Sequence, residues 1–155
     1  MLYETKKKTI AIEDELKMIR DYIALQQLRF GKKAEVNITT DIDDQSGQIT
    51  PLLMLPLVEN AFKHGMGNSA ETSPIYINIR LKNNQLQITI RNQSISPSIK
   101  LEQDEGIGLA NIQSQLQLLY REYNFNFGKE EKDFVVKLEI NLTSYAGFEL
   151  FDSGR

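Results

Sequence analysis

A group of polar side chains at the end of an otherwise apolar segment is the first candidate for chemistry in this sequence. Residues 50–65 are apolar almost all round a helix, yet four polar residues gather near its end: Glu59, Asn60, Lys63 and His64. The carbonyl oxygen of Asn60 could hold Mg²⁺, a hard cation that takes few protein oxygens together with phosphate oxygens and water. Lys63 and His64 could then contact nucleotide phosphates. Each residue also has an ordinary explanation: a satisfied buried amide, a solvated lysine and a hydrogen-bonded structural histidine.

A pair of glycines is the second candidate. Gly106 and Gly108 come just before an amphipathic segment, 109–120, so we expect a helix that begins at the glycines. Their backbone amides could face a phosphate at the helix N-terminus, or the glycines could simply relieve close packing. The spacing matches neither a Rossmann fingerprint nor a P-loop. A polar stretch, 92–105, leads into the glycines, and connections of that length are usually functional or disordered.

The elements that must position these residues follow from hydrophobic periodicity. Helical spacing predicts a helix at 12–30, ended by Gly31, and a second helix with Thr50 as N-cap and Pro51 as its first residue. Strands are predicted at 34–42, 75–81, 86–90, 123–127 and 134–142, with a hairpin turn at 82–85. This order predicts an α+β fold with helices over one face of a largely antiparallel sheet. The helix at 12–30 must bury its apolar face, either on its own domain or against a partner helix in a dimer.

Composition narrows the classes of function. The chain has 155 residues, a formal net charge of -3 and no cysteine. One domain is expected at this length. The acidic balance argues against nucleic acid as the main partner, and the lack of cysteine excludes disulfides and thiolate metal sites. No apolar run approaches the roughly 20 residues that cross a bilayer, so no membrane contact is expected from this part of the protein.

Three segments resemble the LytS/YehU-like sensor histidine kinases. Residues 51–65, which read PLLMLPLVENAFKHG, resemble their N-box, the most specific of the three motifs. Residues 106–112, which read GIGLANI, and 118–120, LLY, resemble their glycine box. The run from Glu15 and Leu16 through Tyr22 to Phe30 resembles the helix before their catalytic domain. The resemblance covers about 2–142.

This resemblance implies an ATP-binding catalytic domain with the Bergerat (GHKL) fold, a two-layer α/β sandwich. Asn60 would ligate Mg²⁺, Asn92 would hold the adenine amino group, and 93–105 would form a lid over ATP. The catalytic residues would be Asn60, Lys63 and His64. The nucleotide-binding residues would be these three together with Asn92, Gly106, Ile107, Gly108 and Leu109.

The sequence departs from the family pattern at three places. Asn92-Gln93-Ser94 replaces an aspartate-x-glycine box, and Gln115 stands where an arginine is common. Pro56 lies four residues before Asn60, where related ATPases carry a water-activating glutamate. Without such a base, hydrolysis should be slow, which suits a kinase that keeps its γ-phosphate for transfer.

The histidine count leads to an expectation about the parent protein. His64 is the one histidine, and it belongs to the nucleotide motif, so the phosphoacceptor histidine should lie on an upstream helix outside this chain. We expect 1–31 to be the last helix of a dimerisation or linker region, 32–143 the ATP-binding domain and 144–155 a tail. The domain should be cytoplasmic in a membrane-anchored, homodimeric parent that passes its phosphoryl group to a response regulator receiver domain.

Two other functions stay open from the residues alone. A degenerate kinase domain that serves as a dimerisation or docking module is favoured by the altered box at Asn92 and by the apolar stripe of 12–30. An ATPase of the same fold is disfavoured by Pro56.

Overall fold

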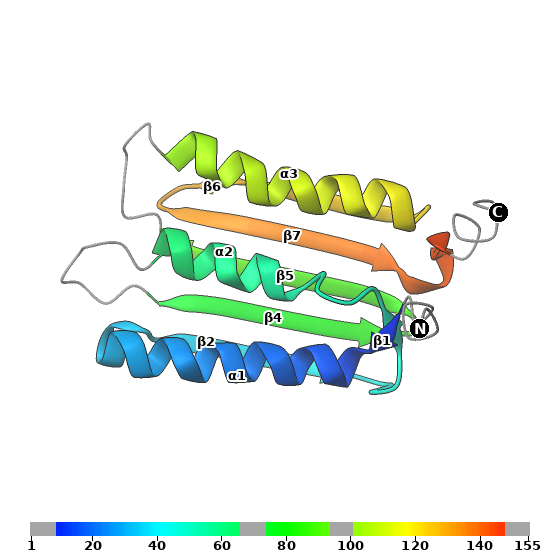
Figure 1. The fold of residues 1–155 in the computed structure, drawn as a ribbon, viewed down its shortest axis with the longest axis horizontal. Helices are drawn as coiled ribbons and strands as arrows, with labels where there is room; N and C mark the ends of the chain where they lie inside the picture. Colours follow the sequence, from blue (N-terminus) through cyan, green and yellow to red (C-terminus); the bar gives the residue numbers. More distant parts are fainter. Residues whose placement is uncertain (1–8, 66–73, 94–100, 148–155) are drawn as a thin grey trace, which may run out of the picture.

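The computed structural model describes residues 9–65, 74–93 and 101–147, with backbone alone for 101–107. A five-stranded sheet and three long helices make up most of this part of the chain (Figure 1). The elements, in chain order, are β1 (Ile10–Ala11), α1 (Ile12–Phe30), the 3₁₀ turn Gly31–Lys33, β2 (Val36–Ile42), β3 (Gln48–Ile49), α2 (Leu55–Gly65), β4 (Ile75–Lys82), β5 (Gln85–Gln93), α3 (Leu101–Leu119), β6 (Tyr123–Glu130), β7 (Asp133–Asn141) and the 3₁₀ turn Leu142–Ser144.

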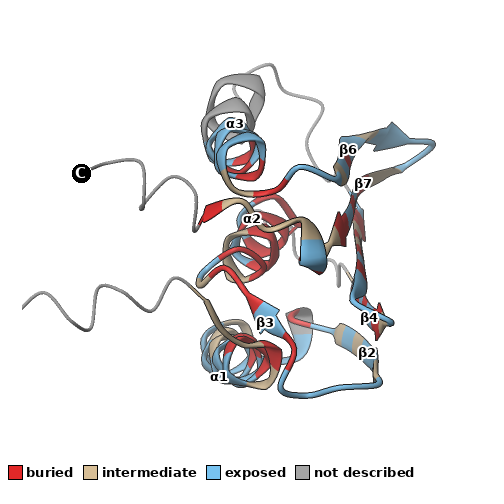
Figure 2. Ribbon diagram, turned by 90° about the vertical axis from the view of Figure 1, so that its right-hand side faces the viewer, coloured by how far each residue is buried: buried red, intermediate tan, exposed pale blue. Residues whose placement is uncertain are grey.

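The sheet is mixed and has the strand order β2-β4-β5-β7-β6. β2 runs parallel to β4, and every other neighbouring pair is antiparallel. All three long helices lie on one face of this sheet, and no helix of the described residues covers its other face (Figure 2). The predicted two-layer α/β sandwich, with helices on one face of a mostly antiparallel sheet, is therefore confirmed.

Strand alternation explains how the sheet and the helices share a core. On β4, Ile75, Ile77, Ile79 and Leu81 are buried toward the helices, while the residues between them are exposed. α1 contributes the buried row Ile12, Leu16, Ile19 and Ile23 to the same hydrophobic cluster. Of the two alternatives for the helix at 12–30, packing of its apolar face on its own domain is the one that the structure shows.

The second helix begins later than the sequence predicted. α2 starts at Leu55, whereas the N-cap signal of Thr50 and Pro51 had placed its start at Pro51. Leu52 has a φ of 58°, in the left-handed region, so the chain turns there and cannot be helical. Thr50 is bound elsewhere, because its amide donates to the hydroxyl of Tyr120 at 3.1 Å. A tertiary contact has thus overridden a local start signal.

The third helix begins earlier than predicted. α3 starts at Leu101, so Gly106 lies inside the helix and does not open it. The expected lid, 93–105, is divided: Gln93 ends β5, 94–100 lie outside the described residues, and 101–105 are helical. The added turn reads Leu-Glu-Gln-Asp-Glu, which are mostly good helix formers, and acids near a helix N-terminus are favoured by its dipole. Local propensity therefore carries the helix back beyond the glycines.

Candidate functional site

The two flanks of α2 carry different kinds of residue. α2 lies between α1 and α3 on the helix side of the sheet (Figures 1 and 2). On one flank, the ring of Phe62 makes an edge contact with Tyr22 of α1, with the ring centroids 5.5 Å apart. Asn60 and His64 are one helical turn apart and share the opposite flank. Asn60 and His64 therefore face away from α1, toward the side on which α3 lies.

Burial separates the three residues predicted on α2. Asn60 is 9% exposed and His64 is 6% exposed, while Lys63 is exposed to solvent. Burial of Asn60 and exposure of Lys63 are compatible with both the functional and the ordinary explanation of these residues. The roles of the three residues in binding or catalysis remain predictions.

Asn92, on β5, lies beside the last residue of α2. It is the penultimate residue of β5 and continues the buried register of Leu86, Ile88 and Ile90, although it is polar. A methyl group added to Gly65, the last residue of α2, would lie 3.3 Å from Cβ of Asn92 and 3.4 Å from its Nδ2. The absence of a side chain at position 65 thus lets the amide of Asn92 pack directly against the end of α2.

The amides of Asn60 and Asn92 both have a hydrogen-bond donor that is unsatisfied among the described residues. The Nδ2 atom of each is buried and has no hydrogen-bond partner among the described residues. An unpaired buried donor costs about 1–3 kcal/mol, and for that reason most such groups in folded proteins are paired. Two such donors, one on α2 and one on the helix side of β5, fit a ligand with acceptor atoms, such as phosphate oxygens and ring nitrogens of a nucleotide base. The oxygen end of each amide is the kind of ligand that Mg²⁺ takes.

The residues predicted around the glycine box lie within α3. Gly108 is exposed, with nothing within 4 Å of a side-chain carbon added there, and Leu109 is a buried core residue. In a helix that begins at Leu101, only the first four backbone N–H groups lack a partner within the helix. Contact between the amides of 106–109 and a phosphate therefore requires the first turns of α3 to unwind. The predicted role of Gly106, Ile107, Gly108 and Leu109 stays a prediction.

Glu15 is the residue near the site that the sequence did not single out. Its side chain is fully buried, and its carboxylate accepts backbone N–H groups at the start of α2 from Leu53 at 3.2 Å, from Leu55 at 3.3 Å and from Met54. Burial raises the pKa of Glu15, and the backbone N–H donors oppose that rise. Its place within the apolar row of α1, between Ile12 and Leu16, was the available signal, because an acid on a buried face needs a partner.

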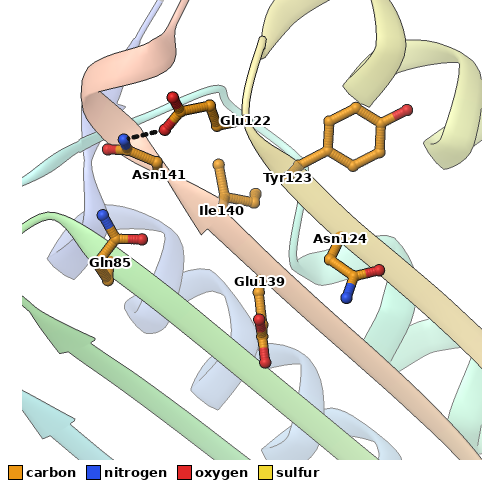
Figure 3. Close-up of a pocket in the computed structure, with 7 residues that line it drawn as sticks. All are labelled: Gln85, Glu122, Tyr123, Asn124, Glu139, Ile140 and Asn141. Carbon is orange, nitrogen blue, oxygen red and sulfur yellow. Dashed lines mark hydrogen bonds between the residues drawn. The ribbon is translucent and has the colours of Figure 1, made fainter.

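A polar cavity at the opposite end of β5 from Asn92 is not part of this site. It has a volume of about 170 Å³ and is lined by Gln85, Glu122, Tyr123, Asn124, Glu139, Ile140 and Asn141 (Figure 3). Gln85 begins β5, whereas Asn92 lies near its end. Two of its polar side chains pair with each other, since Asn141 donates to Glu122 at 2.6 Å.

Comparison with known proteins gives relatives of one kind. No protein-family profile matches the chain. The sensor histidine kinase YpdA of Escherichia coli is 36% identical over 73% of this chain and 21% of its own length. The sensor protein kinase HptS of Staphylococcus aureus is 30% identical over 77% of this chain and 20% of its own. The sensor protein LytS of Staphylococcus epidermidis is 26% identical over 70% and 18%. The chain spans about a fifth of the length of these relatives.

Solved structures show the same fold. The histidine kinase domain of a blue-light activated kinase from Erythrobacter litoralis superposes with a TM-score of 0.61 at 17% identity, over 88% of this chain and 63% of the other. The catalytic domain of the histidine kinase ThkA gives a TM-score of 0.53 at 16% identity, over 80% and 90%. At these identities the likeness establishes the fold.

Proposed function

We infer that this chain, a homologue of the sensor histidine kinases with the fold of their catalytic domains, binds ATP with Mg²⁺ for phosphorylation of a histidine elsewhere in its parent protein. The observation that carries the proposal is the pair of buried amides, Asn60 and Asn92, whose donor ends have no hydrogen-bond partner among the described residues. Phosphate oxygens would pair with the amide nitrogen of Asn60, and the base would pair with one end of the amide of Asn92.

Different residues would bind the Mg²⁺, the phosphates and the base of the nucleotide. Asn60 would offer its carbonyl oxygen to Mg²⁺, and Lys63 and His64 would lie close to the phosphates. Asn92 would contact the base, and the backbone from Gly106 to Leu109 would approach the phosphates after the first turns of α3 unwind. When bound, Mg²⁺ neutralises charge on the phosphate oxygens, which is its part in phosphoryl transfer.

Pro56 bears on how the γ-phosphate is used. It is the second residue of α2 and lies one helical turn before Asn60, on the same flank. Its side chain has no group that could take a proton from water. We propose that the site therefore holds ATP with slow hydrolysis and keeps the γ-phosphate for the histidine.

The wider setting of the domain is part of the proposal. The parent would be a homodimer, with its acceptor histidine on an upstream dimerisation helix, and would transfer the phosphoryl group to the receiver domain of a response regulator. Among the helices in the described part of the chain, none is both long enough and apolar enough to cross a bilayer. Membrane anchoring of the parent rests on its family resemblance.

Autophosphorylation of the parent tests this function. The full-length protein, incubated with γ-labelled ATP and Mg²⁺, should acquire an acid-labile phosphoryl group. Replacement of Asn60 by alanine should reduce labelling by at least about tenfold, because a lost hydrogen bond or ligand to a charged group is worth about 1.5–3 kcal/mol. Asn124→Ala, an exposed asparagine on β6, is the matched control and should keep wild-type labelling. Equal labelling of wild type and Asn60→Ala would contradict the proposal.

A further inference from the structure

The side chain of Asn92 is buried on the helix side of the sheet. It is 1% exposed and pairs in register with Ile75 and Phe134 on the neighbouring strands. The residues on either side of it in the sequence, Arg91 and Gln93, point toward the other face of the sheet, since successive strand residues alternate. Only Asn92, of these three, packs against Gly65 at the end of α2.

The side chain of Asn92 can both donate and accept hydrogen bonds. A carboxamide has two donors on its nitrogen and an acceptor oxygen, whereas a carboxylate is an acceptor only. The nitrogen, Nδ2, is buried and has no hydrogen-bond partner in the part of the chain that the structure describes. As oriented, Asn92 therefore complements an acceptor atom of a ligand. A half-turn about the last side-chain bond offers the oxygen in its place, and the two ends are so similar in size that the turn needs little room.

Purines differ in the group that such an amide would meet at their six-position. Adenine carries an amino group there, which is a donor, and guanine carries a carbonyl oxygen, which is an acceptor. Hypoxanthine carries the same carbonyl oxygen. Nδ2 complements the oxygen, and Oδ1 complements the amino group. A carboxylate in the place of the amide would complement the amino group alone.

We propose that Asn92 makes the nucleotide site tolerant of the group at the purine six-position, so that 6-oxopurine triphosphates bind about as well as ATP. The inference rests on the proposed function, in which Asn92 faces the base. Asn92 then determines base specificity through its amide, and a change from amide to carboxylate at this one position restores a preference for adenine.

Calorimetric titration with Mg·ATP and Mg·ITP tests this inference. Inosine triphosphate is the suitable probe because it presents the oxygen without the additional amino group of guanine. The ratio of the two Kd values for wild-type protein should lie within about tenfold of one, since either end of the amide makes one neutral hydrogen bond. In Asn92→Asp the ratio should shift toward ATP by at least about tenfold, because two acceptors would then face each other.

A matched control separates this contact from a general effect of charge. Asn78→Asp makes the same amide-to-carboxylate change on the neighbouring strand β4, where the side chain is exposed. It should leave the ratio of Kd values at its wild-type level. A shift in Asn78→Asp as large as that in Asn92→Asp would overturn the inference.

Other outcomes distinguish the inference from the function on which it rests. A folded wild-type protein that binds ATP but prefers it over ITP by more than about a hundredfold overturns the inference alone. Failure of folded wild type to bind either nucleotide overturns the proposed function as well. If circular dichroism shows that Asn92→Asp does not fold, Asn92→Ala takes its place. It should weaken ATP and ITP to a similar degree, and a loss confined to ATP would overturn the inference.

Discussion

At the scale of single residues, the buried amides of Asn60 and Asn92 lower the stability of the fold. Each leaves a donor unpaired among the described residues, and Asn60 also occupies a helix interior, where asparagine is a poor choice. Proteins retain such costs mainly at functional sites, where the same groups meet a ligand. Removal of the polar group should therefore have opposite effects on stability and on binding.

Asn60→Leu tests this opposition. It replaces an unpaired amide by an apolar group of similar size and better helix propensity. The free energy of unfolding without nucleotide should rise by about 1 kcal/mol, measured by urea denaturation, while nucleotide binding is lost. Asn124→Leu, at an exposed position of β6, should change stability by less than about 0.5 kcal/mol. A loss of 1 kcal/mol or more in Asn60→Leu would show that the amide stabilises the fold.

Local pattern singled out the candidate site residues on α2 but gave no role to Glu15. The run from Pro51 to Gly65 identified Asn60, Lys63 and His64, because the motif is continuous in sequence. Glu15 escaped notice because the N–H groups that it binds lie 38 to 40 residues further along the chain. A contact of that separation leaves no local periodicity.

At the scale of elements, α2 is anchored at its start by its two neighbours. Glu15 from α1 binds the N–H groups of residues 53–55, and Tyr120, just after α3, binds Thr50 through its hydroxyl. A helix needs partners for its first N–H groups, and here a side chain from another helix supplies them. The N-cap predicted at Thr50 was wrong because this tertiary partner decides where the helix begins.

Glu15→Ala should weaken the start of α2. Three backbone N–H groups lose their acceptor, so the free energy of unfolding should fall by about 2 kcal/mol, measured by denaturant titration. Glu13→Ala is the control, because Glu13 lies two residues earlier in α1 and its side chain makes an exposed ion pair with Arg20 at 3.2 Å. That variant should change stability by less than about 1 kcal/mol. Equal stability of Glu15→Ala and wild type would show that the buried carboxylate does not cap α2.

At the scale of the whole molecule, periodicity predicted the architecture well. The helix at 12–30 has the predicted bounds, and the predicted strands all occur, with ends that differ by a few residues. Strand order and the parallel pairing of β2 with β4 could not be read from periodicity, because they depend on contacts between distant segments. The apolar face of α1 belongs to the same core as the sheet, so most of the stripe that suggested a dimerisation module is already buried.

The central claim is that the chain binds ATP with Mg²⁺. Calorimetric titration of the folded wild-type chain with ATP and Mg²⁺ tests it most directly. The claim predicts saturable binding at one site, with a Kd in the micromolar to millimolar range that rises when Mg²⁺ is removed. Asn60→Ala should raise that Kd by at least about tenfold. Absence of binding to ATP and to ADP, in protein whose circular dichroism shows a folded chain, would contradict the account.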